Sequence, residues 1–249
     1  MTERRITSRQ NPILQQVRKL LSSRSEREKT GRFVADGTKL LAEAVQWWDG
    51  LETVILADDV QVQVPEQTQI IRVPADVMAS ISPMQTPQGA LFVCRLPSKK
   101  AFAPTAGMLL LDGIQDPGNM GSILRTADAL NVPVALLEGC VDPYSHKVVR
   151  ASMGAVFRTA VVQTTWQEAQ QACKSKNIPI AVTALSAKSQ DIRTACLNQM
   201  AVVIGSEGQG VRSEILQQAD AQLVIPMNSR CESLNAAIAA AIVMWQMGK

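Results

Sequence analysis

The sequence predicts an α/β protein of two domains, the second of which is built on a parallel sheet. The chain of 249 residues suits one large or two small domains, and its hydrophobic content of 46% can supply a core. From Met108 onward, short continuous apolar runs alternate with helical segments, as in a parallel sheet covered on both faces. A stretch rich in Pro, Gly and Lys precedes Met108. We therefore place the domains at residues 1–98 and 108–249, joined by a linker at 99–107.

The first domain is predicted to be a small α/β unit. Apolar residues recur at helical spacing over residues 12–21 and 38–48, and the charged stretch 22–31 extends the first helix or forms a turn. Three apolar runs bounded by turn residues indicate strands at 53–56, 70–73 and 90–93.

The second domain is predicted to alternate strands with helices. Apolar runs indicate strands at 108–111, 132–137, 159–162, 179–184, 201–204 and 222–225. Helical segments are expected at 119–130, 166–176, 211–218 and 233–247. The last of these helices is apolar on nearly every side, so we expect it to be buried all round. It is shorter than the roughly 20 apolar residues that span a bilayer.

Charge is distributed unevenly along the chain. Residues 1–39 contain ten basic and four acidic side chains, a net charge of +6, whereas the whole chain carries +3. A basic arm on a near-neutral body indicates a polyanionic partner, although a charged helix in solvent would have the same composition.

The cysteines and the single histidine argue against a metal site. The five cysteines lie far apart without a CxxC pair, and His146 is the only histidine. Dispersed free cysteines fit an intracellular enzyme better than a disulfide scaffold. We find no signal peptide or transmembrane run, and we expect a cytoplasmic protein without membrane contact.

The loop after the first strand of the second domain carries the first candidate residues. Asp116-Pro-Gly forms a turn, and Asn119 is a natural N-cap for the helix that follows. Gly121, costly in a first helical turn, suggests close approach of a ligand to the backbone. Arg125 lies off the apolar stripe and is able to hold a phosphate or a sugar with its fork of donors, or it is a surface residue.

A glycine-rich loop follows the predicted strand 201–204. Its sequence is Gly205-Ser-Glu207-Gly-Gln-Gly210, and a helix follows, so backbone N–H groups are offered to a ligand. The glycine spacing matches neither the dinucleotide fingerprint nor a Walker motif. Glu207 is the only ionisable group in this loop.

The third candidate loop follows the strand 222–225. It begins at Pro226 and runs to Ser233, which we expect to cap the last helix. Ligands of open α/β sheets bind outside the carboxyl ends of strands, so the three loops are expected to converge on one site. A further run, residues 146–158, has basic and small residues that suit a phosphate backbone or a closely packed helix.

Together the three loops resemble the signature motifs of the SpoU (TrmH) family of RNA ribose methyltransferases, in the SPOUT superfamily. The matching residues occur in the order Asn119-x-Gly-x-x-x-Arg125, then Gly205-x-Glu-Gly-x-Gly210, then Ile225-Pro-Met followed by Ser233-Leu-Asn235. The resemblance covers essentially the whole chain. Residues 7–12 and 33–37 look like the substrate-binding domain that often precedes the catalytic domain.

The resemblance implies methyl transfer from S-adenosylmethionine to a ribose 2′-hydroxyl of RNA, with rRNA favoured over tRNA. It also implies a deep trefoil knot and a homodimer in which the last helix lies near the interface. Cofactor contacts would come from Gly205, Ile225, Met227 and Leu234. The polar catalytic centre would be formed by Asn119, Arg125, Glu207, Ser233 and Asn235.

This sequence departs from the family pattern at Ser229, where many members have glycine. If the backbone there must adopt a positive φ, serine is unfavourable. Family accounts let Arg125 activate the hydroxyl, but a guanidinium stays protonated in proteins. We therefore expect Arg125 to hold a phosphate and stabilise developing charge, and Glu207 to be a candidate proton acceptor.

Two other functions compete with this interpretation. A non-catalytic RNA-binding protein could retain the methyltransferase fold, but Asn119 and Arg125 are both present. A nucleotide-dependent enzyme could bind phosphates in the glycine-rich loop, but the phosphate-binding fingerprints are missing.

Overall fold

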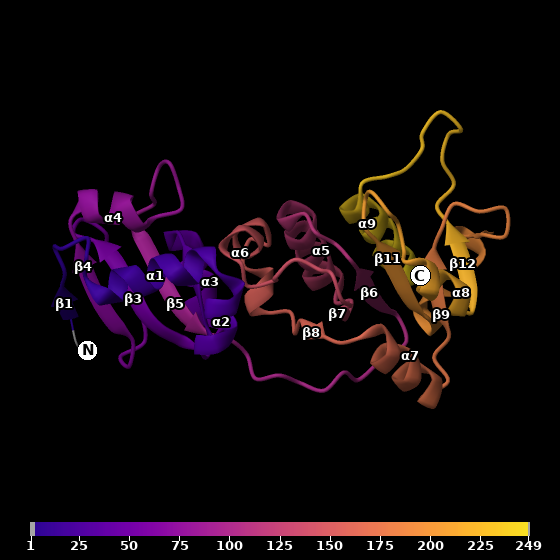
Figure 1. The fold of residues 1–249 in the computed structure, drawn as a ribbon, viewed down its shortest axis with the longest axis horizontal. Coiled ribbons are helices and arrows are strands. Elements are labelled where there is room, and N and C mark those ends of the chain that lie inside the picture. The colour runs from indigo at the N-terminus through magenta and orange to yellow at the C-terminus, as the bar shows by residue number, and fades with distance from the viewer. Residues whose placement is uncertain (1–2, 249) are drawn as a thin grey trace. The chain divides into compact units, whose positions relative to one another are not determined.

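A computed structural model describes residues 3–248 and divides the chain into two compact units (Figure 1). The first unit contains the chain up to Ser98 and also the segment Tyr144–Arg158. The second contains Lys99–Pro143 and the chain from Thr159 onward. The segment Tyr144–Arg158 lies in sequence within the predicted second domain, whereas its core contacts belong to the first unit.

The first unit has a five-stranded mixed sheet in the order β1-β4-β3-β5-β2. Its strands are β1 (Glu3–Arg5), β2 (Arg32–Asp36), β3 (Leu51–Ala57), β4 (Gln69–Val73) and β5 (Ala90–Arg95). The strands predicted at 53–56, 70–73 and 90–93 are confirmed, whereas β1 and β2 were not predicted. In β1 the three residues are exposed and polar, so the strand has no apolar pattern.

Helices cover both faces of this sheet. They are α1 (Pro12–Ser22), α2 (Arg24–Thr30), α3 (Thr38–Trp47), α4 (Ala75–Ile81) and α6 (His146–Ala151). Side chains of α1 and α4 share a core with Val34 and Ile55, and side chains of α3 share another with Phe33 and Val54. Neighbouring strand residues therefore point to opposite faces. The charged stretch 22–31 forms a separate helix, α2, because Ser23 caps it.

The segment Tyr144–Arg158 packs closely into the first unit, so the interpretation of a closely packed helix holds. Tyr144 and Phe157 join the core of Phe33 and Phe92, and the rings of Phe33 and Tyr144 are 5.1 Å apart. Gly154 has a φ of +91°, and a Cβ there would contact the side chain of Glu43. His146 is half-buried, its Nδ1 lies 3.3 Å from the carbonyl oxygen of Leu21, and burial lowers its pKa.

The second unit has a seven-stranded sheet in the order β10-β12-β9-β11-β6-β7-β8. All its strand pairs are parallel, as predicted. The strands are β6 (Met108–Asp112), β7 (Val134–Leu136), β8 (Val162–Gln163), β9 (Ile180–Thr183), β10 (Gln190–Asp191), β11 (Ala201–Gly205) and β12 (Ala221–Val224). The two-residue strand β10 was not predicted, and β8 overlaps the predicted strand 159–162 only at Val162.

Helices also cover both faces of this parallel sheet. They are α5 (Pro117–Leu130), α7 (Trp166–Ser175), α8 (Ser213–Gln218) and α9 (Ala236–Met247), with short 3-10 turns at Ile192–Thr194 and Leu197–Gln199. A further 3-10 turn, Ala155–Phe157, belongs to the first unit. Trp166 of α7 and Ile215 of α8 share one core with Leu110 and Val203. Helices α5 and α9 pack together, and α9 also contacts β11.

Two predicted helix caps are wrong. Helix α5 begins at Pro117 and is capped by Asp116, whose carboxylate accepts the backbone N–H of Asn119 at 2.8 Å. Asn119 therefore lies within the first turn, because proline at the first helical position extends the helix. Helix α9 begins at Ala236 and is capped by Asn235, not by Ser233, which precedes the helix. The predicted cap lies three residues after the actual one in α5 and two residues before it in α9.

The prediction that the last helix is buried all round is also wrong. Ile238 and Trp245 of α9 are 53% and 64% exposed. The sequence is apolar on this side as well, so periodicity could not distinguish the open face. Within residues 3–248, no helix is long and apolar enough to cross a membrane.

Candidate active site

Three loops meet outside the carboxyl ends of β6, β11 and β12. The amide nitrogen of Asn119, after β6, donates a hydrogen bond to Oε1 of Glu207, after β11. The amide nitrogen of Asn235, after β12, donates to Oδ1 of Asn119 at 2.9 Å. One residue from each predicted motif thus enters a single hydrogen-bonded chain. Convergence of the three loops is confirmed.

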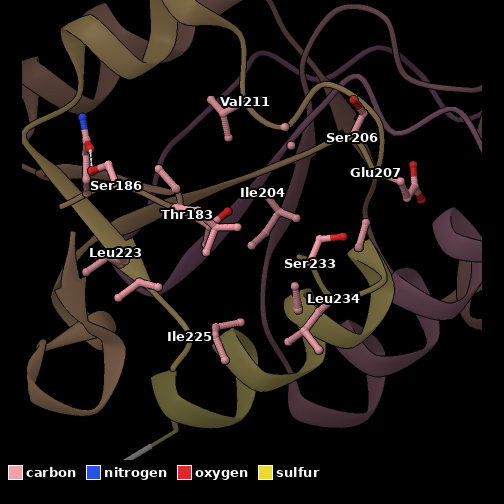
Figure 2. A pocket seen from close by; sticks show the side chains of 18 of the residues that line it. Thr183, Ser186, Ile204, Ser206, Glu207, Val211, Leu223, Ile225, Ser233 and Leu234 are labelled. Atoms are coloured by element: carbon pink, nitrogen blue, oxygen red, sulfur yellow. Dashed lines mark hydrogen bonds between the residues drawn. The ribbon is translucent and has the colours of Figure 1, made fainter. Parts of the chain in front are cut away.

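Glu207, at one end of these hydrogen bonds, lines a cavity of about 530 Å³ (Figure 2). Its apolar walls include Ile204, Leu223 and Leu234, and its polar rim includes Ser206 and Glu207. Predicted site residues that line it are Gly205, Glu207, Ile225, Met227, Ser233 and Leu234. All four residues expected to contact a cofactor are therefore present in the wall.

The glycine-rich loop closes on itself above the end of β11. Ser206 and Gly210 exchange backbone hydrogen bonds of 3.1 and 2.9 Å, and the N–H of Gln209 donates to the hydroxyl of Ser206 at 3.3 Å. These three N–H groups are used inside the loop, so they are not offered to a ligand. A Cβ on Gly205 would overlap the backbone of Gly210 and Val211, which explains why glycine is needed there.

The third loop tolerates Ser229. The non-glycine residues with positive φ in the described part of the chain are Asn131, Met153 and Asn177, and Ser229 is not among them. Asn228 forms a turn in which its carbonyl accepts the N–H of Cys231 at 2.9 Å. The departure from the family pattern therefore does not strain the backbone.

Arg125 and Gly121 lie outside the cavity wall. Arg125 is exposed on α5, six residues after Asn119, and it forms no hydrogen bond or ion pair with other described residues. Its guanidinium is thus available to a ligand. Gly121 is buried within α5, so its expected role in backbone contact with a ligand is not supported.

One wall of the cavity was not predicted from the sequence. Thr183, the last residue of β9, and the three residues after it, Ala184, Leu185 and Ser186, line the cavity together with the glycine-rich loop. Ser186 donates a hydrogen bond to Oε1 of Gln222, another lining residue, at 2.7 Å. The signal was present, since β9 is a buried strand whose end lies at the same edge. Its small and apolar residues did not suggest chemistry.

The fold and the cavity define a class of protein. A cavity of this size, with apolar walls and few polar groups outside the ends of parallel strands, fits a nucleoside cofactor. Such an arrangement is typical of α/β enzymes that bind a cofactor through loops.

Comparison with known proteins identifies the family. Residues 107–245 match the model of the SpoU rRNA Methylase family, and residues 11–91 match the MRM3-like substrate binding domain. The chain is 31% identical to the Bacillus subtilis protein named 23S rRNA (guanosine(2553)-2′-O)-methyltransferase RlmP, covering 92% of this chain and 93% of that protein. It is also 27% identical to the mouse protein named rRNA methyltransferase 3, mitochondrial, and the match covers 94% of this chain and 71% of the mouse protein.

Solved structures have the same fold. An rRNA methyltransferase from Sinorhizobium meliloti, determined with bound AdoMet, aligns with a TM-score of 0.86 at 27% identity, covering 98% of this chain and 97% of that one. The chain therefore belongs to the SpoU family. It is an RNA methyltransferase, and its cofactor is S-adenosylmethionine.

Proposed function

We propose that this enzyme methylates a ribose 2′-hydroxyl of rRNA. The observation that carries the proposal is the chain Asn235–Asn119–Glu207, which sets a carboxylate at the rim of the cofactor cavity. The RlmP protein of Bacillus subtilis, similar over nearly the whole chain, is named as a 2′-O-methyltransferase of 23S rRNA. When bound, S-adenosylmethionine supplies a sulfonium-activated methyl group.

Glu207 has a suitable position for accepting the hydroxyl proton. Its Oε1 accepts the hydrogen bond from Asn119, while Oε2 accepts none from the residues that the structure describes. A free carboxylate oxygen in a held side chain can take a proton from a nearby hydroxyl. Asn119 and Asn235 orient this carboxylate, and Ser233 lines the same cavity.

Arg125 is assigned to the RNA rather than to the proton transfer. It has no partner within the described chain and lies off the cavity wall, on the helix that carries Asn119. A guanidinium stays protonated and forms bidentate hydrogen bonds to phosphate. Its charge also stabilises negative charge that develops on the attacking oxygen.

The first unit is assigned to RNA binding. Its first 39 residues carry a net charge of +6, and residues 11–91 match a substrate binding domain. The segment Tyr144–Arg158 adds Lys147 and Arg150, both exposed and three residues apart on α6. Phosphate contacts of this kind make binding depend on salt. Charge reversal of Lys147 should weaken rRNA binding in filter assays, and unchanged affinity would contradict this assignment.

A homodimer is supported by the open apolar face of α9. Ile238 and Trp245 lie seven residues apart, two turns along one side of the helix, and both are largely exposed. Pairing of this face with a second copy would cover it. We also propose that the third loop follows a knotted path and that the protein is located in the cytoplasm. The linker at residues 99–107 is proposed to separate the RNA-binding domain from the methyltransferase domain.

The function is tested with purified protein, S-adenosylmethionine and rRNA. We expect transfer of labelled methyl to rRNA and resistance of the product to alkaline cleavage beside the modified ribose. Both should be lost in Arg125→Ala. Wild-type protein that binds the cofactor and rRNA without transfer would support a non-catalytic RNA-binding protein. Methyl groups located on bases would overturn the 2′-hydroxyl as acceptor.

A further inference from the structure

Both ends of the glycine-rich loop lie beside Asp112, one through strand pairing and the other through its carboxylate. Asp112, the last residue of β6, is the register partner of Gly205 in β11, where the loop begins. The residue is only 1% exposed. Arg212, where the loop ends, donates to the two carboxylate oxygens, from its backbone N–H at 2.8 Å and from Nε at 2.6 Å. Arg212 thus holds the end of the loop next to its beginning.

Arg212 also reaches a second strand of the sheet. Its Nη2 donates to Oε2 of Glu138, just after β7, at 2.8 Å. Glu138 in turn accepts the backbone N–H of Trp166, the first residue of α7, at 3.2 Å. Burial would raise the pKa of the Glu138 carboxyl, but hydrogen bonds from Arg212 and from backbone N–H groups lower it. The carboxylate is therefore charged at neutral pH.

This network has a function beyond stability because of what it encloses. The ion pair joins the buried Asp112 to the partly exposed Arg212, and such a pair alone is weak evidence for stability, since desolvation offsets the attraction. Here the fastened loop supplies much of one cavity wall, namely Gly205, Ser206, Glu207, Gln209, Gly210 and Val211. Figure 2 shows Val211, the neighbour of Arg212, together with Ser206 and Glu207 around the cavity. A shift of the loop exit would move this wall.

We infer that Asp112 and Arg212 are positioning residues for methyl transfer. They hold the glycine-rich loop in the conformation that forms the cofactor wall and brings Glu207 to Asn119. Neither side chain lines the cavity, so both act through the loop. The inference depends on the cofactor and is independent of which RNA accepts the methyl group.

The affinity for S-adenosylmethionine is measured by calorimetry on the full chain. Asp112→Asn and Arg212→Gln are each expected to weaken binding about tenfold, because either change releases the loop exit. The double variant should be no weaker than the weaker single variant, since both changes remove one connection. Arg212→Lys keeps the charge without the fork of donors, so its cofactor affinity should lie between those of the wild type and Arg212→Gln. Glu214→Gln, a surface change on α8, is the control and should bind normally.

Hydrogen exchange without cofactor separates loop positioning from general stability. In Arg212→Gln, the amides of Ser206, Gly210 and Arg212 should exchange faster, while those of β6 and β11 exchange as in the wild type. Unchanged cofactor affinity in both single variants would overturn the inference. Uniformly faster exchange through β6 and β11 would also overturn it, because the pair would then only stabilise the fold.

Discussion

The side chains of Asn235 and Asn119 are joined by a hydrogen bond of 2.9 Å, although the two residues lie 116 positions apart in the sequence. Asn235 also caps α9 through its Oδ1, and Asn119 lies in the first turn of α5. Because Asn119 donates to Glu207 as well, the starts of two packed helices and the glycine-rich loop are fixed to one another. The position of the Glu207 carboxylate therefore depends on both helices.

Replacement of Glu207 by Gln tests this carboxylate as the proton acceptor. The amide oxygen of Gln still accepts the hydrogen bond from Asn119, so the loop should keep its position. The single-turnover methylation rate should fall by about 10²–10⁴, the usual contribution of a general base. The cofactor affinity, measured by calorimetry, should change little. A variant that keeps the wild-type rate at every pH would exclude Glu207 as the acceptor.

Two glycines of the same loop provide a matched pair of alanine variants. Gly205→Ala would place a Cβ on the backbone of Gly210 and Val211, so the loop must move. We expect a loss of about 1–3 kcal/mol in the free energy of unfolding and weaker cofactor binding. Gly208→Ala meets no atom within 4 Å and should behave as wild type. Urea unfolding and calorimetry measure both effects, and equal behaviour of the two variants would contradict this account.

Convergence of the site could be predicted from the sequence, whereas its local geometry could not. The ends of parallel strands share one edge, so Asn119, Glu207 and Asn235 were expected to meet. Asn119 and Ser233 are both good capping residues, but Asp116 and Asn235 stand closer to the helix starts that the backbone adopts. The choice between adjacent caps depends on loop packing, which periodicity does not contain.

The segment Tyr144–Arg158 shows a second limit of sequence analysis. Its apolar residues would suit either core, since composition does not specify the partner of a buried side chain. Its place in the first unit is given by the packing of Tyr144 and Phe157 in that core and by the ion pair between Arg158 and Glu43. Arg212 was missed for a related reason, because its carboxylate partners are distant in sequence.

Phe157→Ala tests whether this segment completes the first core. Phe157 is buried, and its ring centroid lies 5.7 Å from that of Trp48 and 6.2 Å from that of Phe92. We expect the first unit to lose about 3–5 kcal/mol of stability. Limited proteolysis should then cut within residues 1–98 sooner than in the wild type, while cofactor affinity is retained. Wild-type protease resistance of residues 1–98 would contradict the packing.

Trp245→Glu tests the open face of α9 as a dimer interface. A charge placed in an apolar interface opposes association, because it would lose its hydration. Sedimentation velocity should show a dimer for the wild type and a monomer for the variant. Trp47→Glu, at an exposed tryptophan of the first unit, is the control and should leave the dimer intact. A monomeric wild type, or a dimeric Trp245→Glu protein, would exclude this interface.

Thiol alkylation tests the burial of the cysteines. Burial raises the pKa of the Cys140 and Cys173 thiols to about 11, and it also raises that of Cys94. A thiol with a pKa of about 11 is roughly one-thousandth thiolate at about pH 8, because each pH unit below the pKa lowers the thiolate fraction tenfold. Cys196 and Cys231 are exposed. Iodoacetamide should therefore label only Cys196 and Cys231 in the folded protein, and mass spectrometry should find all five labelled after unfolding. Rapid labelling of Cys140, in a loop, or of Cys173, in α7, would show that the structure around that cysteine opens.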